Sequence, residues 1–348
     1  MLEKPALADE RIVACLQEEY GLPVDDLRFL PLGADLRTAV YRADAGILPP
    51  YFVKLRQGAL YEASVAVPRH LADLGLKQVI PPLPTRSGKL WADLPPYVVV
   101  LYPFIEGRDG FAQPLADRQR MEWGAALKQL HTTPIPATIT RDIPRETFSP
   151  QWRASLTQFL VHLNGETYLD SVARELAAFL RSRRDLLTML VARAERLARA
   201  LQTHPTEFVL CHADLHAWNI LIDAHGALYI VDWDTLIFAP KERDLMFVGS
   251  GLGGRGHTLQ EEASLFYQGY GSTPVDAAAL AYYRYDRIIE DIASYCEQIF
   301  LSSEGDADRK QALLSAQFNF SPNGTIAIAC RADTMLPTVE KNAFLAQI

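Results

Sequence analysis

Three short apolar segments in the second half of the chain enclose a fixed set of polar residues. Residues 208–211 and 220–222 flank a loop that contains Asp214 and Asn219, and residues 228–231 end at Asp232. Short apolar runs bounded by polar residues are typical of β-strands. The pattern therefore predicts a loop held between strands and a second carboxylate at the end of the next strand, and functional side chains often project from such places.

The spacing of these three polar residues suits phosphoryl transfer. Asp214 is placed to accept the proton of an attacking hydroxyl, and general-base assistance of this kind accelerates reactions about 10²–10⁴-fold. Asn219 and Asp232 supply oxygen ligands of the type that hold Mg²⁺ against nucleotide phosphates. An isolated Asp214 would be interpreted as a residue that caps a turn. Its spacing from Asn219 and Asp232 favours the catalytic interpretation.

Four further polar residues surround this loop. Asp234 is either a second metal or substrate contact or a structural hydrogen-bonding residue. We expect His212 to support the loop through a backbone hydrogen bond. His216 is predicted either to approach phosphate or to be structural. Asp244 is predicted to anchor the following helix to the loop.

The first hundred residues predict a helix followed by a set of strands. Apolar residues at helical spacing over residues 7–20 stop at Gly21, a residue type common at helix C-termini. Apolar segments separated by Pro and Gly clusters then predict strands at 27–32, 38–42, 51–56, 89–93 and 97–102. Residues 61–74 predict an inserted helix. Pro68 predicts a kink or a start nearer Val67, because proline lacks a backbone donor.

Lys54 lies in a strand segment that is otherwise built for burial. A lysine in such a place is costly unless an anion meets it, and nucleotide phosphates would serve, with Glu62 as the carboxylate that positions the ammonium group. The alternative is an edge-strand lysine that blocks aggregation. The loop 33–37, with Gly33 and Arg37, is a candidate to cover the phosphates, although it has a single glycine.

Pro and Gly in residues 102–107 close the strongest strand, and the chain beyond them is mainly helical. Helical patterns occupy residues 117–131, 152–160, 171–180, 184–201 and 276–301. This order predicts an α+β protein of two lobes. We expect a small antiparallel-sheet lobe at residues 1–102, a hinge at 103–107 and a larger, mainly helical lobe at 108–348.

Three acidic residues of the last of these helices, Asp286, Glu290 and Asp291, lie among tyrosines. Residues 286 and 290 share a face by helical spacing. An acidic and aromatic surface suits an amine-bearing substrate. The equal alternative is a solvated helix face that also carries Arg284 and Arg287.

The composition limits the classes of partner. The net charge of −8 argues against a nucleic-acid surface and is compatible with a cationic small molecule. No apolar run approaches the ~20 residues that span a bilayer, and the N-terminus lacks the apolar core of a signal peptide. The four cysteines form no CxxC pair, so we expect buried free thiols and a cytoplasmic protein.

The polar residues of the loop and strands resemble a known family. His212, Asp214, Asn219 and Asp232 match the signature of the aminoglycoside phosphotransferase family, small-molecule kinases with a protein-kinase-like fold. The resemblance covers about residues 1–325 and is closest to the branch that phosphorylates spectinomycin at its 9-hydroxyl. It includes the segments 33–35, 52–55, 102–105, 211–212, 239–247 and 282–295, of which 239–247 is the most specific. Pro68 and the pair Leu36-Arg37 depart from it.

The resemblance implies ATP- and Mg²⁺-dependent transfer of the γ-phosphate to a hydroxyl of spectinomycin, and thereby antibiotic resistance. Asp214 would be the base, Asn219 and Asp232 the metal ligands and Lys54 the phosphate contact. The adenine would lie against backbone groups of Leu101, Tyr102 and Phe104. Two alternatives remain: a kinase of a metabolic alcohol such as choline, homoserine or a sugar derivative, and a nucleotide-binding regulator without catalysis.

Overall fold

The computed structural model describes residues 3–33, 35–163, 168, 170–203, 207–249, 257–302, 305–322 and 324–333. The chain forms two compact units. The first comprises Met1–Pro144, His212–Ile237 and Leu252–Ser272, and the second comprises Arg145–Cys211, Phe238–Gly251 and Thr273–Ile348. The lobe boundaries expected from the sequence stay a prediction. Most of the tail 331–348, which lies beyond the family resemblance, is outside the described residues.

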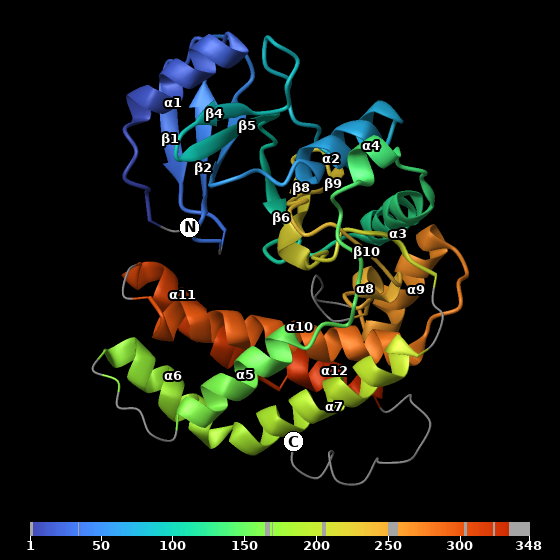
Figure 1. The fold of residues 1–348 in the computed structure, drawn as a ribbon. Coiled ribbons are helices and arrows are strands. Elements are labelled where there is room, and N and C mark those ends of the chain that lie inside the picture. Colours follow the sequence, from blue (N-terminus) through green and yellow to red (C-terminus); the bar gives the residue numbers. More distant parts are fainter. Residues whose placement is uncertain are drawn as a thin grey trace. The chain divides into compact units, whose positions relative to one another are not determined.

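A five-stranded antiparallel sheet dominates the N-terminal part of the first unit (Figure 1). Its strand order is β1-β2-β3-β5-β4. The strands are β1 (Asp26–Leu30), β2 (Thr38–Asp44), β3 (Tyr51–Gln57), β5 (Tyr97–Pro103) and β4 (Ala92–Leu94). The predicted strands are confirmed, except that residues 31–32 lie beyond β1 and residues 89–91 do not belong to β4. Thr85 and Lys89 instead close a turn through a backbone hydrogen bond of 2.7 Å.

One face of this sheet carries the core of the N-terminal part. Val53 and Leu55 of β3 lie opposite Leu101 and Val99 of β5, and all four side chains are buried. Helix α1 (Asp9–Cys15) adds Ile12 to the same cluster, and the π-helical turn η1 (Leu16–Tyr20) adds Leu16. The helix ends at Gly21 with a φ of 71°, as the sequence predicts.

Helix α2 (Ala63–Asp73) contains Pro68 in its interior. The predicted start nearer Val67 is wrong, because the helix begins at Ala63. Its apolar face is buried at Val65, Val67 and Leu71, and tertiary packing of an apolar face supplies most helical stability in proteins. Burial therefore outweighs the loss of one backbone donor at the proline.

The rest of the first unit contains a second sheet and a pair of packed helices. Strands β6 (Gly107–Asp109), β8 (Ile220–Asp223) and β9 (Leu228–Ile230) pair in the order β6-β8-β9, and the short turn η2 (Ala217–Asn219) precedes β8. Helix α3 (Asp117–Thr132) packs on α9 (Leu259–Tyr270), and the short α4 (Ala137–Thr140) contacts α2. The segments predicted around Asp214 and Asp232 are thus strands flanking a loop.

The second unit is mainly helical (Figure 1). Its long helix α10 (Ala277–Phe300) packs against α5 (Gln151–His162), α7 (Arg184–Gln202), α11 (Asp306–Phe318) and α12 (Thr325–Asp333). It also contains α6 (Ser171–Ser182), α8 (Glu242–Leu245) and the paired strands β7 (Val209–Cys211) and β10 (Ile237–Ala239). The five helical segments predicted from the sequence are confirmed, and the fold class is α+β. Helices α4, α9, α11 and α12 were not predicted.

Two further expectations concern the cysteines and membrane-spanning helices. All four cysteines, Cys15, Cys211, Cys296 and Cys330, are buried and free of disulfides, as expected. Among the described residues, none of the helices combines the length and apolar character that a membrane span requires.

Glycines allow α3 and α9 to approach each other closely. A Cβ atom at Gly269 would overlap the carbonyl oxygen of Met121 and lie 3.0 Å from the amide nitrogen of Ala125. A Cβ atom at Gly124 would overlap the carbonyl oxygen of Phe266. Both neighbours are backbone atoms of the facing helix, so a side chain can be admitted only if the helices separate.

We predict that Gly269→Ala lowers the free energy of unfolding by about 2 kcal/mol or more, because overpacking separates the two helices. In an unobstructed helix the same change would stabilise by up to about 1 kcal/mol, so the sign of the effect identifies the contact. Urea unfolding of the variant and of Gln268→Ala, an exposed neighbour on α9, measures it. A stabilised Gly269→Ala variant would contradict the close packing.

Candidate active site

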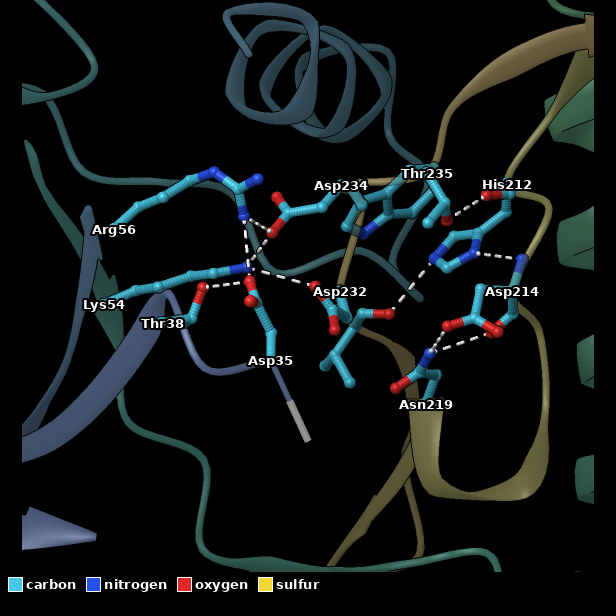
Figure 2. A network of polar contacts seen from close by, with 12 residues as sticks. Asp35, Thr38, Lys54, Arg56, His212, Asp214, Asn219, Asp232, Asp234 and Thr235 are labelled. Atoms are coloured by element: carbon cyan, nitrogen blue, oxygen red, sulfur yellow. Dashed lines mark hydrogen bonds and ion pairs between the residues drawn. The ribbon is translucent and has the colours of Figure 1, made fainter. Parts of the chain in front are cut away.

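The loop before β8 is organised around the side chain of His212, which is completely buried. Its Nε2 lies 3.1 Å from the carbonyl oxygen of Val231, and its Nδ1 accepts a hydrogen bond of 3.3 Å from the backbone N–H of Asp214. Thr235 donates from its hydroxyl to the His212 carbonyl at 2.7 Å (Figure 2). These bonds confirm the predicted support and join the loop to the segment that carries Asp232.

The Asp214 carboxylate is held by residues of its own loop. Asn219 Nδ2 donates to the backbone oxygen of Asp214 at 2.8 Å and to its Oδ2 at 3.1 Å. His216 Nε2 lies 3.5 Å from the other carboxylate oxygen, Oδ1. Because the amide nitrogen of Asn219 is directed at Asp214, its Oδ1 remains available as an acceptor, and no described residue donates a hydrogen bond to it.

Two residues of the site adopt left-handed backbone conformations. Ala213 has a φ of 70° and Asp232 a φ of 64°, values that cost energy for residues other than glycine. Buried Trp233 lies beside Asp232, with its ring 4.9 Å from that of His212 and its Nε1 donating to the Ile230 carbonyl at 3.2 Å. The surrounding packing thus imposes the backbone turns that direct both aspartates.

Lys54 of β3 meets two carboxylates that follow β9. Its ammonium group lies 3.1 Å from Asp232 Oδ1 and 2.8 Å from Asp234 Oδ2 (Figure 2). Burial lowers the pKa of Lys54, but the two carboxylates outweigh burial and hold the pKa above its ordinary value. The ammonium group therefore stays charged at neutral pH.

The predicted ion pair between Lys54 and Glu62 is not formed among the described residues. Glu62 immediately precedes α2, and its side chain is exposed. The structure instead pairs Lys54 with Asp232 and Asp234. Asp234 is thus a partner of the lysine in this arrangement, which the sequence did not indicate; a nucleotide contact by Glu62 stays a prediction.

The ion pairs continue from Asp234 to the loop after β1. Arg56 Nη1 lies 3.1 Å from Asp234 Oδ2 and 3.2 Å from Asp35 Oδ2. Asp35 also accepts from the Thr38 hydroxyl at 2.7 Å and from the backbone N–H of Arg37 at 2.8 Å. Burial raises the pKa of Asp35, but these hydrogen bonds and the nearby cations hold its pKa below the usual value.

Asp35, Arg56, Asp234, Lys54 and Asp232 thus form one row of alternating charges, the charge row (Figure 2). Sequence reasoning missed Asp35 and Arg56. The period of a strand could have indicated Arg56, because residues 54 and 56 project from the same face of β3. Gly33 has a φ of 83° in the same loop, and Ala34 lies outside the described residues.

The residues expected to contact adenine lie at the end of β5. Leu101 accepts a backbone hydrogen bond of 2.7 Å from Leu83, and the N–H of Phe104 donates to Pro50 at 3.1 Å. Tyr102 packs its ring edge-on to Phe52, with 6.4 Å between the ring centroids. Burial raises the pKa of the Tyr102 hydroxyl above its ordinary value. Their role toward a nucleotide stays a prediction.

The acidic residues of α10 belong to the second unit and are paired with arginines. Asp286 lies 3.2 Å from Arg153 and 3.8 Å from Arg243, and Glu290 lies 3.6 Å from Arg243. Asp291 lies 2.9 Å from Arg287. Burial raises the pKa of Asp286 to about 6, against the opposing effect of Arg243.

The two sequence interpretations of this helix face are therefore both incomplete. Tyr282, Tyr283 and Tyr285 are completely buried, so the face is not solvated, and they belong to the packing rather than to an open aromatic surface. Asp244 is also completely buried in this unit. The substrate role of these acidic residues stays a prediction. An amine of a substrate would have to compete with arginines for their carboxylates.

A loop that carries a carboxylate and an amide, next to a second carboxylate that pairs with a strand lysine, offers the kinds of group that phosphoryl transfer uses. Residues 26–283 match the sequence profile of the phosphotransferase enzyme family. The chain belongs to this family, as its resemblance to aminoglycoside phosphotransferases implied. It is a small-molecule kinase.

Known proteins resemble the chain over most of its length. A solved structure of the spectinomycin phosphotransferase APH(9)-Ia with ADP and spectinomycin is 33% identical, has a TM-score of 0.85 and covers 95% of this chain and 99% of its own. Protein StrN of Streptomyces griseus is 26% identical over 263 residues, which cover 70% of this chain and 77% of StrN. A microcompartment-associated aminopropanol kinase shares the fold, with 18% identity, a TM-score of 0.60 and coverage of 94% and 98%.

Proposed function

We propose that the protein transfers the γ-phosphate of ATP, with Mg²⁺, to a hydroxyl of an aminocyclitol antibiotic, most specifically the 9-hydroxyl of spectinomycin. The observation that carries the proposal is the likeness to APH(9)-Ia, which extends over nearly the whole of both chains at 33% identity. In a bacterium the reaction would take place in the cytoplasm and confer resistance. The assembled site supports the same reaction type.

The chemistry follows from the loop geometry. Asp214 would accept a hydrogen bond from the acceptor hydroxyl and take its proton as the oxygen attacks the γ-phosphate. The bonds from Asn219 and the proximity of His216 fix the direction of the carboxylate before the acceptor arrives. Preorganisation of the carboxylate lowers the activation free energy of the transfer, because little orientational entropy is left to lose when the acceptor binds.

The charges around Lys54 suit a nucleotide with its metal. The Lys54 ammonium group would contact the phosphates, and the loop that contains Gly33 and Asp35 would cover them. Asp232 and Asn219 would hold Mg²⁺, which when bound neutralises phosphate charge. Both fit: Asp232 has a half-exposed side chain whose described partner is Lys54 alone, and Asn219 Oδ1 accepts no hydrogen bond from a described residue.

The alternatives differ in strength. A non-catalytic regulator is disfavoured by family membership and by the joint presence of Lys54, Asp214, Asn219 and Asp232 in one site. A kinase of a metabolic alcohol has the same catalytic residues. The similarity to aminopropanol kinase concerns the fold alone at 18% identity, so spectinomycin remains the acceptor with specific support.

Substrate is tested by ATP turnover across spectinomycin, other aminoglycosides, choline, homoserine and aminopropanol. We expect the highest kcat/KM with spectinomycin, and expression in a susceptible bacterium should raise its tolerance of this drug. Turnover of a metabolic alcohol with none of spectinomycin would replace the proposed acceptor and leave the reaction type intact.

We predict that Asp214→Asn lowers kcat by about 10²–10⁴-fold, because the amide cannot accept the hydroxyl proton. The affinity for ATP should be nearly unchanged, since the base contacts the acceptor. Steady-state kinetics and calorimetric ATP binding measure the two effects. Asp26→Asn, at an exposed aspartate of β1, is the matched control. Full turnover by Asp214→Asn would show that another group is the base.

Asp232→Asn should weaken ATP binding in the presence of Mg²⁺ by at least about tenfold, a loss that even outer-shell partners of a metal produce. Asparagine tolerates the left-handed backbone at this position, so the charge is the main change. Binding measured with EDTA should differ little between the variant and the wild type. Equal losses with and without Mg²⁺ would assign the effect to Lys54 and remove Asp232 from the metal site.

A further inference from the structure

Phe111 and Trp218 form an exposed pair of stacked aromatic rings beside the catalytic loop. Their ring centroids are 4.5 Å apart and the ring planes differ by 23°. Phe111 is 50% exposed and Trp218 49% exposed, although aromatic side chains are strong contributors to burial elsewhere. We infer that this pair, the aromatic shelf, binds the ring face of the phosphate acceptor. The inference rests on the proposed function and extends it to the residues that recognise the substrate.

The backbone holds the shelf rigidly. The N–H of Gly110 donates to the carbonyls of Ala217 at 2.9 Å and Ile220 at 2.8 Å, which fixes the end of β6 against η2. A Cβ atom at Gly110 would lie 3.0 Å from the Ala217 oxygen and 2.8 Å from Leu115 Cδ1, so glycine permits this approach. Asp109 Oδ1 accepts from the N–H groups of Phe111 and Ala112 at 2.9 and 2.8 Å. The shelf is therefore preorganised.

The shelf is continuous with the catalytic base. Trp218 lies in η2, between Asp214 and Asn219 in the chain. His216 bridges them in space: its ring is edge-on to Trp218 with 5.6 Å between centroids, and its Nε2 is 3.5 Å from Asp214 Oδ1. A molecule resting on the shelf can therefore present a hydroxyl to Asp214 while its body covers the indole.

The chemistry of the shelf selects a class of occupant. Aromatic faces are negative and attract C–H groups and ammonium groups, so a saturated ring that carries amines suits them. Two side chains offer far less area than the roughly 800 Å² per partner of a stable protein interface. The acidic residues of α10 are paired with arginines, whereas both rings of the shelf are half-exposed. The inferred ligand is an aminocyclitol.

The test uses Trp218→Ala and Phe111→Ala in the full chain, with spectinomycin and ATP as substrates. We expect each variant to raise KM for spectinomycin about tenfold or more, the scale on which apolar contacts discriminate substrates. KM for ATP should stay within about twofold, because the shelf contacts the acceptor only. Trp218→Phe keeps an aromatic ring and should recover most of the affinity. Phe318→Ala, at a phenylalanine that is 47% exposed on α11, is the matched control.

Calorimetry measures the affinity for spectinomycin directly, so an effect on binding is distinguished from an effect on turnover. Unchanged spectinomycin affinity in both alanine variants would overturn the inference. So would an equal rise in both KM values, or a fall in kcat alone, since either would show that the loop is distorted. If the wild type acts on another acceptor of the substrate screen and not on spectinomycin, the proposed acceptor fails, and the same variants are assayed with that compound. An unchanged KM for it would overturn the shelf as well.

Discussion

The ammonium group of Lys54 joins parts of the chain that are almost two hundred residues apart. Its side chain is 15% exposed, and a buried cation is stable only when carboxylates compensate for lost hydration. Asp232 and Asp234 provide that compensation, so the burial of Lys54 requires β3 and the segment after β9 to lie together. The same interaction brings together the residues that we propose to hold the phosphates and the metal ion.

The arrangement of the loop was predictable because it is encoded over a short distance. The spacing of Asp214 and Asn219 places them in one loop, and the strand before Asp232 sets its carboxylate at a strand end. The partners of Lys54 were not predictable in the same way. Glu62 precedes α2 and Asp234 lies in the turn after β9, and only the packing of the two sheets determines which carboxylate reaches the ammonium group.

Local rules were also overridden by burial elsewhere in the chain. The proline penalty in α2 is real, but it competes with an apolar face that is buried along the whole helix. On α10 the helical spacing correctly placed Asp286 and Glu290 on one face. Their arginine partners come from other elements, so no window of sequence around residue 286 could show that the charges are compensated. Helical periodicity reports which face is shared and says nothing of what lies opposite.

The charge row ends with a carboxylate at each side, three acids against two bases. Each internal member has neighbours of opposite sign, so loss of any one leaves two like charges without the ion that separated them. The five positions therefore form a single electrostatic unit in which substitutions are not additive. In such a unit, a substitution that removes one charge leaves its neighbours uncompensated unless a second substitution restores the alternation of charge.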